Sequence, residues 1–264
     1  MARTYQDIIY EKKDQVARIT INRPKQYNAC TGDTFKELTL ALEDAGSDGE
    51  VGVIVLTGAG DKAFSAGGDV NWEKTAGADR MILEPYNLHF TISRCLKPII
   101  ARVNGYAIGG GNHLAYWCDL SIAAEHAIFG QNGPRVGSPA CGPVVNYLTK
   151  VVGHKRAREM WMLCRKYTAK QALEWGLVNA VVPMEKLDEE VQKWCDEILA
   201  LSPTCLRILK GSFVDEYENI LGQGDIVRRL VLTPEFWQGE QQEGARAFLE
   251  KRQPNFRQFR KAKA

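Results

Sequence analysis

The chain has 264 residues and a nearly balanced charge, with 34 Lys and Arg against 32 Asp and Glu. A dedicated nucleic-acid-binding protein carries a strongly basic face, so this balance argues against one. The chain is 45% hydrophobic, as folded domains are, and its apolar runs stay well below the roughly 18 residues of a membrane span. The seven cysteines form no CxxC pair, which predicts reduced thiols, a cytoplasmic protein and no metal site.

The first half of the chain alternates predicted strands and helices. The run Val51–Thr57 is almost continuously apolar, as in a strand buried on both faces of a parallel sheet. Residues 64–80 are rich in glycine and polar residues, and we expect a loop there. Strands are predicted at 8–10, 16–21, 51–57, 99–103 and 120–124, and helices at 31–45, 82–95 and 112–118. This alternation is typical of an α/β fold.

From about Val144 the sequence is mostly helical. Helices are predicted at 154–164, 168–175, 187–201, 204–217 and 235–251, with one short strand at 178–182. Thr31 and Thr168 are expected to cap the helices that follow them. We therefore expect an α/β core over residues 1–200 and a helical C-terminal part over 201–264.

Glycine is concentrated in two short stretches. Of the 24 glycines, four lie in residues 58–68 and eight in 105–142. The loops Phe64–Asp69 and Gly105–Asn112 each follow a predicted parallel strand, where ligands bind in open α/β folds. Two converging backbone N–H groups can stabilise a thioester oxyanion, by roughly 3–4 kcal/mol per donor. Taken alone, a glycine-rich turn is common in α/β proteins, and neither loop matches a nucleotide-binding motif.

Taken together, the two loops resemble those of the crotonase (enoyl-CoA hydratase/isomerase) family. The similarity extends over about residues 8–260, and its strongest stretches are 21–29, 53–58, 63–69, 97–111, 118–130 and 172–183. It implies a spiral of ββα units and a helical C-terminal trimerisation region, hence a homotrimer or homohexamer. Within the family, segment 130–138 is most similar to 1,4-dihydroxy-2-naphthoyl-CoA synthases and 2-ketocyclohexanecarboxyl-CoA hydrolases, which act on rings, as in the degradation of aromatic compounds. Residues 155–161 and 250–254 add support.

The resemblance implies roles for individual residues. The oxyanion donors would be the N–H groups of Gly68 and Gly110. Coenzyme A would be part of the substrate, and no tightly bound cofactor is implied. The residues expected near it are Lys25, Lys62, Ser65, Ala66 and Asp69. A lysine in a turn is also often simply solvated, which is the alternative for Lys25 and Lys62.

Two positions depart from the pattern of the hydratases, which use a pair of glutamates to handle water. His113 stands at the first of these positions and Gly133 at the second. Ordinary hydration by a glutamate pair is therefore disfavoured. Naphthoyl-CoA synthases also carry glycine at the second position, where bound bicarbonate can supply the base, so bicarbonate is a candidate here.

The ring enzymes carry two further polar groups that this sequence lacks. Their aspartate is replaced by Ala140, and their tyrosine falls where this chain has Phe236 and Trp237. We therefore expect a more apolar pocket, with Pro139 and Pro143 among its walls.

Other side chains could replace the missing acids and bases. His113 lies near a helix N-terminus, which disfavours its charged form and favours a neutral imidazole that can accept a proton. Its alternative role is to fill the space of a lost glutamate. His89, on the helix over the pocket, is a second candidate base. Asn132 and Ser138 could orient a water molecule.

Three functions remain open at this point. The first is an acyl-CoA enzyme that opens or forms a C–C bond in a cyclic substrate through a thioester enolate. The second is a hydratase or isomerase of a cyclic enoyl-CoA with a non-standard base. The third is a non-catalytic relative that binds CoA, or RNA through the basic tail Lys251–Ala264, although a solvated tail is the preferred interpretation.

Overall fold

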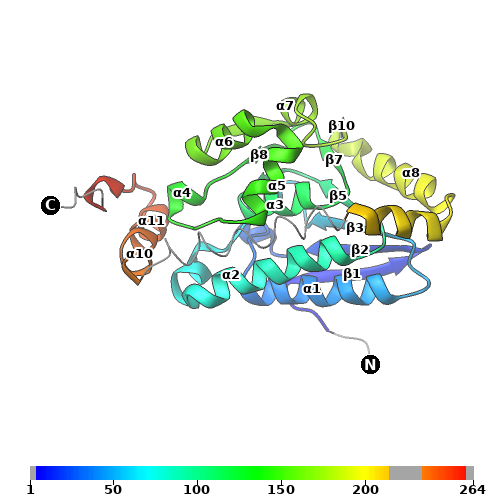
Figure 1. Cartoon of the computed structure of the whole chain (residues 1–264), viewed down its shortest axis with the longest axis horizontal. Coiled ribbons are helices and arrows are strands. Elements are labelled where there is room, and N and C mark those ends of the chain that lie inside the picture. Colours follow the sequence, from blue (N-terminus) through cyan, green and yellow to red (C-terminus); the bar gives the residue numbers. More distant parts are fainter. Residues whose placement is uncertain (1–3, 214–233, 260–264) are drawn as a thin grey trace.

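The computed structural model describes residues 4–213 and 234–259 (Figure 1). Its centre is a six-stranded sheet in the order β1-β2-β3-β5-β7-β10, parallel except for the β1–β2 pair. The strands are β1 (Ile8–Lys13), β2 (Val16–Ile21), β3 (Val53–Gly58), β5 (Ile99–Val103), β7 (Leu120–Ala124) and β10 (Ala180–Val182). The α/β class is confirmed, and the predicted strands are present with bounds shifted by a few residues.

Strands β3 and β5 are buried along their whole length, as the apolar run of β3 predicted. Alternate side chains serve two cores, because neighbouring residues of a strand point to opposite faces. Ile54 and Leu56 belong to the larger core, to which α1 and α3 contribute. Val53 and Val55 pack with residues of α8 (Leu187–Leu199) on the other face.

Helices α1 (Gly32–Ser47) and α2 (Val70–Arg94) lie side by side along one face of the molecule (Figure 1). Thr31 caps α1 as predicted, in a capping box with Thr34. The prediction of a loop over 64–80 is wrong from Val70 onward. Asp69 caps α2 by accepting hydrogen bonds from two backbone N–H groups of its first turn, so the helix begins well before Ile82.

A second, four-stranded sheet was not predicted. It consists of β4 (Ala63–Ser65), β6 (Tyr106–Ile108), β8 (Ile128–Gly130) and β9 (Lys166–Thr168). Its strands have three residues each, too few to show a periodic pattern. Strands β4 and β6 are parallel, with Ala63 opposite Tyr106 and Ser65 opposite Ala107. The two glycine-rich loops follow directly and therefore leave the sheet side by side.

The remaining helices are short and pack partly against one another. They are α3 (Gly110–Trp117), α4 (Gly133–Val136), α5 (Pro143–Val152), α6 (His154–Leu163), α7 (Ala169–Glu174), residues 203–213, α10 (Pro234–Gln238) and α11 (Glu240–Leu249), with 3₁₀ turns η1 (Pro24–Gln26), η2 (Met184–Lys186) and η3 (Phe256–Phe259). Helix α5 packs against α6, and α11 packs against α2 and α4. Thr168 caps α7 as predicted.

The single helix predicted at 235–251 is wrong, because the chain breaks at Gly239 into α10 and α11. A Cβ at Gly239 would lie 2.8 Å from the carbonyl oxygen of Glu235 and 3.0 Å from the ring of Phe259. The glycine therefore lets η3 pack against the bend. The end of the helix predicted at 204–217 lies outside the described residues.

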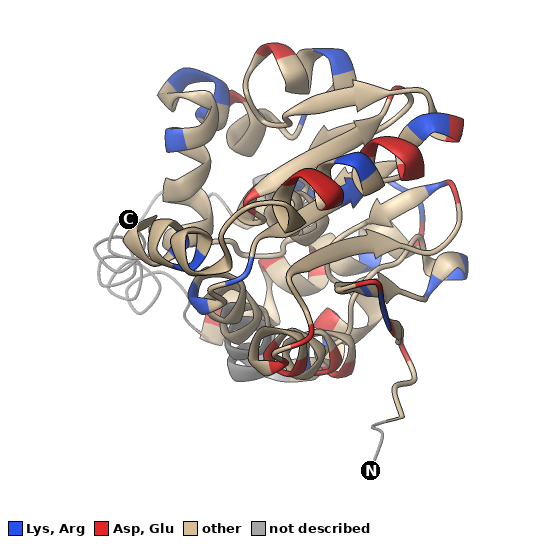
Figure 2. Ribbon diagram, turned by 90° about the vertical axis from the view of Figure 1, so that its right-hand side faces the viewer, with Lys and Arg blue, Asp and Glu red and all other residues tan. Residues whose placement is uncertain are grey.

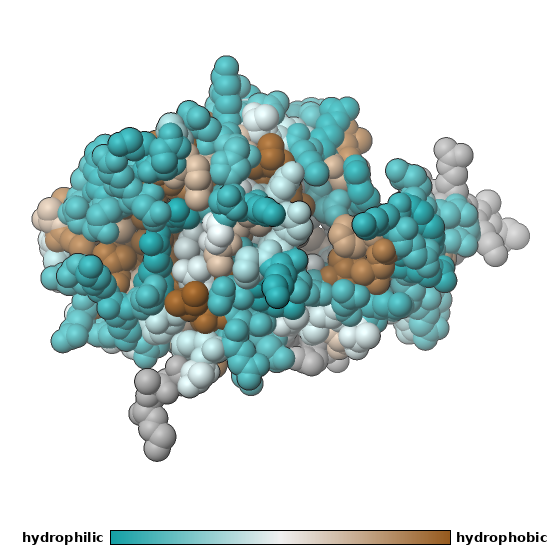
Figure 3. Space-filling view, turned by 180° about the vertical axis from the view of Figure 1, so that it is seen from behind, coloured by the Kyte–Doolittle hydropathy of each residue, from teal (hydrophilic) through white to brown (hydrophobic). Residues whose placement is uncertain are grey.

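Charges of both signs are mixed over the ribbon (Figure 2), and hydrophobic surface on the view from behind forms separate patches among hydrophilic residues (Figure 3). Within residues 4–213 and 234–259, no helix has the length and apolar character needed to cross a membrane.

Candidate active site

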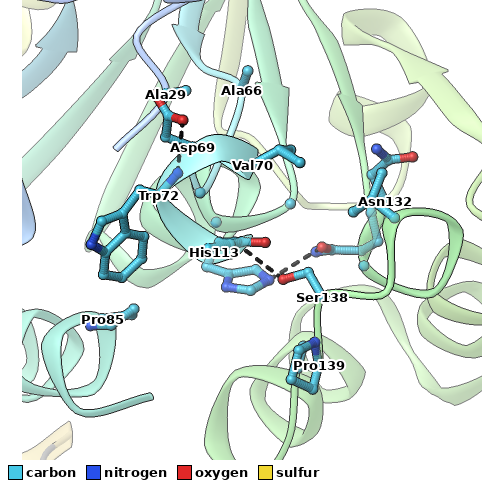
Figure 4. A pocket seen from close by; sticks show the side chains of 18 of the residues that line it. Ala29, Ala66, Asp69, Val70, Trp72, Pro85, His113, Asn132, Ser138 and Pro139 are labelled. Atoms are coloured by element: carbon cyan, nitrogen blue, oxygen red, sulfur yellow. Dashed lines mark hydrogen bonds between the residues drawn. The ribbon is translucent and has the colours of Figure 1, made fainter. Parts of the chain in front are cut away.

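A cavity of about 370 Å³ lies where the two glycine-rich loops meet α2, α3 and the segment around α4 (Figure 4). Its lining is mostly apolar, with Phe35, Val70, Trp72, Val136 and Trp161 as large contributors. The polar groups are few and come from several elements, among them α2, α3 and the segment around α4. A mostly apolar cavity with a few convergent polar groups is typical of a small-molecule site.

The two loops touch at their glycines. Gly67 has φ of +95°, and a Cβ there would lie 2.8 Å from both the Gly110 nitrogen and the Ile108 carbonyl oxygen. A Cβ on Gly110 would be 3.6 Å from the Gly68 nitrogen. Within the described chain, the backbone N–H groups of Gly68 and Gly110 donate to no other group. Both residues line the cavity, so two unused donors lie close together at its wall.

The conformation of the first loop is held from behind. The Ser65 side chain is fully buried, donates to the Asn28 carbonyl oxygen at 2.7 Å and accepts from the Gly67 N–H at 3.1 Å. The Cys30 N–H donates to the Gly67 carbonyl oxygen at 2.7 Å, and the Asp69 N–H donates to that of Cys30 at 2.8 Å. These bonds fix the backbone on both sides of Gly68, whose own N–H takes part in none of them.

The residues expected beside CoA occupy three kinds of position. Ala66 and Asp69 line the cavity, and Asp69 also forms an ion pair with Arg23 at 3.1 Å. Ser65 faces the loop backbone instead. Lys25 and Lys62 are exposed and lie outside the lining, although Gln26 and Tyr27, which follow Lys25, are part of it.

His113 projects into the cavity from the first turn of α3 (Figure 4). Its Nε2 lies 3.2 Å from the Gln131 Oε1, which accepts the hydrogen bond in the neutral tautomer that protonates Nε2. Its ring packs against Trp161, with centroids 5.4 Å apart. The pKa of His113 is lowered to about 3, mainly by burial and to a smaller extent by neighbouring His89, against the opposing effect of the Gln131 hydrogen bond. Burial, rather than the helix N-terminus, is thus the main reason that the imidazole is neutral.

His89 lies 5.9 Å from His113 between ring centroids, so the structure brings the two candidate bases together. Its Nδ1 contacts the Pro85 carbonyl oxygen at 2.5 Å, within α2, and donates to it when protonated. Its Nε2 is buried without a hydrogen-bond partner in the described part of the chain. Burial lowers the pKa of His89 to about 4.

Sequence analysis missed Glu73, which lines the cavity from the first turn of α2. The Ser138 hydroxyl donates to its Oε1 at 3.2 Å. The pKa of Glu73 is raised to about 7, mainly by burial; the hydrogen bond from Ser138 opposes the rise, and nearby Asp69 contributes to it. An N-cap signal at Asp69 could have revealed the residue, since it starts the helix that turns Glu73 toward the loop.

Four more of the expected residues line the cavity: Asn132, Ser138, Pro139 and Ala140. Gly133 does too, and a Cβ there would lie 2.6 Å from the Ser138 carbonyl oxygen, so no side chain fits without movement. The expected walls Pro143, Phe236 and Trp237 are not among the described lining residues; Phe248 and Leu249 of α11 are found instead.

In the described residues, no cluster of three His, Cys, Asp or Glu could hold a metal.

Comparison with known proteins bears on this site as a whole. The model of the enoyl-CoA hydratase/isomerase family matches residues 11–260. An enoyl-CoA hydratase from Mycobacterium avium subsp. paratuberculosis K-10 has 29% identity and a TM-score of 0.84, with 96% of this chain and 99% of that chain covered. An enoyl-CoA hydratase/isomerase from Xanthobacter autotrophicus Py2 has 31% identity and a TM-score of 0.81, with 94% and 97% covered.

A methylmalonyl-CoA decarboxylase, solved in complex with 2-nitronate-propionyl-CoA, is similar to the same extent. It has 29% identity and a TM-score of 0.82, with 96% of this chain and 99% of that chain covered. Similarity over nearly the full length of each protein agrees with the family match. The chain belongs to the enoyl-CoA hydratase/isomerase, or crotonase, family.

Proposed function

We propose that this protein opens, or in the reverse direction forms, a C–C bond in a cyclic β-ketoacyl-CoA through a thioester enolate. The observation that carries the proposal is the pair of unused N–H donors of Gly68 and Gly110 at the wall of a mostly apolar cavity. Such donors stabilise the negative oxygen of a thioester enolate more than the neutral thioester. The lining also contains residues of segment 130–138, which resembles that of ring-forming and ring-opening enzymes.

In the hydrolytic direction, a base takes a proton from water, and the hydroxide adds to the ring ketone β to the thioester. The bond between the ketone carbon and the α-carbon then breaks, and its electron pair becomes the thioester enolate. A proton returns to the α-carbon, giving an open-chain carboxylic acid that still carries CoA. Asn132 and Ser138 would orient the water, with His113 and His89 as candidate bases.

CoA is proposed as part of the substrate, with Lys25 and Lys62 holding its phosphates and Ala66 and Asp69 beside the thioester arm. Lysine suits this role because its ammonium group is a flexible point charge. Bicarbonate remains a candidate for the base that Gly133 cannot supply. The reaction rate with and without added bicarbonate tests it.

A hydratase or isomerase acting on a cyclic enoyl-CoA is the second candidate. The Glu73 carboxyl group in the cavity favours it over the third, non-catalytic candidate, whereas the other lining carboxyl group, that of Asp69, caps α2 and pairs with Arg23. One carboxyl group suffices to move a proton between two carbons of an acyl chain, whereas water addition needs a second group to activate the water.

A thioester panel separates these functions. Purified protein is incubated with a cyclic β-ketoacyl-CoA, a cyclic enoyl-CoA and a cyclic dienoyl-CoA, and products are identified by mass spectrometry and NMR. Ring-opened acid from the first supports the proposal. Hydration or double-bond migration in the others, with the β-keto ring intact, supports the second candidate. Tight CoA binding without turnover, or RNA binding lost on deleting residues 251–264, supports the third.

We also propose assembly into a homotrimer or homohexamer. The helix at 203–213 supports this, because Ile208, Leu209 and Phe213 are between 57% and 64% exposed on it. Large apolar side chains grouped on one helix favour burial against another copy. Light scattering measures the mass, and a monomer would contradict the assembly.

A further inference from the structure

The Glu73 carboxyl group lies directly against the oxyanion loop. A Cβ built on Gly68 would meet Glu73 Oε1 at 1.9 Å and its carboxyl carbon at 2.9 Å. The carboxyl group therefore occupies the space beside the Gly68 α-carbon, next to one of the two unused N–H donors. A thioester whose oxygen accepts from Gly68 and Gly110 would place its α-carbon, one bond from the carbonyl carbon, in this neighbourhood.

Glu73 is not engaged in a structural ion pair. Among the described residues its hydrogen-bond partner is the Ser138 hydroxyl, and no lysine or arginine lies within ion-pair distance of it. Asp69, one turn earlier, differs on both counts: it caps α2 and pairs with Arg23. A cavity-lining carboxyl group without a cation is costly to keep charged, so a purely structural role leaves Glu73 unexplained.

We propose that Glu73 is the catalytic residue that exchanges the proton at the α-carbon of the bound thioester. Its carboxylate takes the α-proton as the C–H electron pair becomes the enolate held by Gly68 and Gly110. In the reverse step the carboxylic acid returns the proton and the C–H bond forms. In ring opening, the same acid would protonate the α-carbon after the C–C bond has broken. The inference rests on the proposed enolate chemistry but not on the ring substrate.

The protonation equilibrium of the residue suits this role. Burial raises the pKa of Glu73 to about 7, so both forms are populated near neutral pH. An acid–base group works best when its pKa is close to the working pH. His89 and His113, whose pKa values burial lowers to about 4 and about 3, are neutral there and are much weaker bases.

The test is hydrogen–deuterium exchange at the α-carbon of a saturated cyclic acyl-CoA in D₂O, followed by NMR. This thioester cannot be hydrated and has no β-ketone, so exchange reports enolate formation alone. We compare the wild-type chain with Glu73→Gln, which keeps shape and loses the titrating proton, and with Glu174→Gln, an exposed position on α7. Glu73→Gln should slow exchange by about 100-fold or more, with thioester binding retained, while Glu174→Gln should match the wild type.

The pH profile gives an independent readout. Exchange by the wild type should rise with pH through the pKa of about 7, because the carboxylate is the active form. Ser138→Ala should move this midpoint to higher pH, since the hydroxyl stabilises the carboxylate. Because the Ser138→Ala variant leaves Glu73 in place, it keeps the proposal testable if Glu73→Gln does not fold.

Three results would each overturn the proposal. They are exchange by Glu73→Gln at the wild-type rate, an unchanged midpoint of the pH profile in Ser138→Ala, and no exchange by the wild type. Failure of the proposed function looks different. If only the proposed ring opening is wrong, the α-proton still exchanges at a rate that depends on Glu73, but the ring of the cyclic β-ketoacyl-CoA is not opened.

Discussion

Two regions of the cavity lining carry titratable groups: the first turn of α2 contains Glu73, and a later part of the same helix meets α3 at His89 and His113. Burial moves the pKa of the carboxyl group toward neutrality and the pKa values of the imidazoles away from it. In the first turn of α2, burial raises the pKa of the Glu73 carboxyl group to about 7. On the side where His89 and His113 lie together, it lowers the imidazole pKa values to about 4 and about 3. Burial disfavours the charged form in both cases, so it brings a carboxylic acid into the working range and takes an imidazole out of it.

This contrast changes the interpretation of the missing glutamates. From the sequence, their absence left histidine as the first candidate for an acid–base group. In the folded chain the histidines are held neutral by burial, and a carboxyl group reaches the oxyanion loop from the first turn of α2. The first turn of α2 therefore suits proton transfer at carbon, and the region around His89 and His113 suits shape and hydrogen bonding.

The largest expected effect comes from removing the oxyanion donor at the start of α3, the backbone N–H of Gly110. Gly110 is the first residue of α3, a position that accepts proline, and Gly110→Pro deletes its N–H. We expect a loss of about 100- to 1,000-fold in turnover. Gly110→Ala keeps the donor, and its Cβ meets Gly67 Cα at an ordinary 3.4 Å, so its loss should be less than about tenfold. Equal losses in the two variants would contradict a donor role.

A second prediction concerns stability at acid pH. His113 has a folded pKa below its unfolded value, so it contributes stability fully above the unfolded pKa and loses it as pH falls toward the folded pKa. Between about pH 8 and about pH 5, His113→Gln should lose roughly 2 kcal/mol less unfolding free energy than the wild type. Denaturant unfolding at both pH values measures this. Parallel losses in both proteins would mean that His113 is not held neutral.

A smaller effect should separate water chemistry from proton transfer at carbon. Asn132 lines the cavity, and its side chain does not cap α4. If it orients water, Asn132→Ala should slow ring opening by about tenfold, as loss of one hydrogen bond would. α-Proton exchange, measured on the saturated thioester, should stay within about twofold because no water is consumed. Equal slowing of both would assign Asn132 to thioester binding instead.

The smallest expected effect concerns α11, which contributes Phe248 and Leu249 to the cavity. Arg252 holds the buried Glu243 of this helix through two hydrogen bonds of 2.8 and 3.0 Å. Arg252→Gln should lower the melting temperature and raise KM while leaving kcat almost unchanged. Arg165→Gln, which breaks an exposed ion pair with Glu159, is the control and should change neither. A fall in kcat would show that α11 does more than border the cavity.

The long elements were predictable because their signals are local. The apolar run of β3 and the capping threonines of α1 and α7 each specify their own element. The start of α2 and the four short strands were missed. The first turns of α2 have a loop-like composition, and a strand of three residues is stabilised by its neighbours rather than by its own pattern.

The sequence by itself determined the α/β class, the family and the two glycine-rich loops, because apolar runs, caps and glycine clusters are written in consecutive residues. Only the tertiary structure decided how these loops meet, through the short parallel pair β4–β6, and which side chains reach them. It also decided which groups can carry a proton. Glu73 and His113 are far apart in the chain, and their pKa values are set by burial in one cavity, which does not exist until the chain has folded.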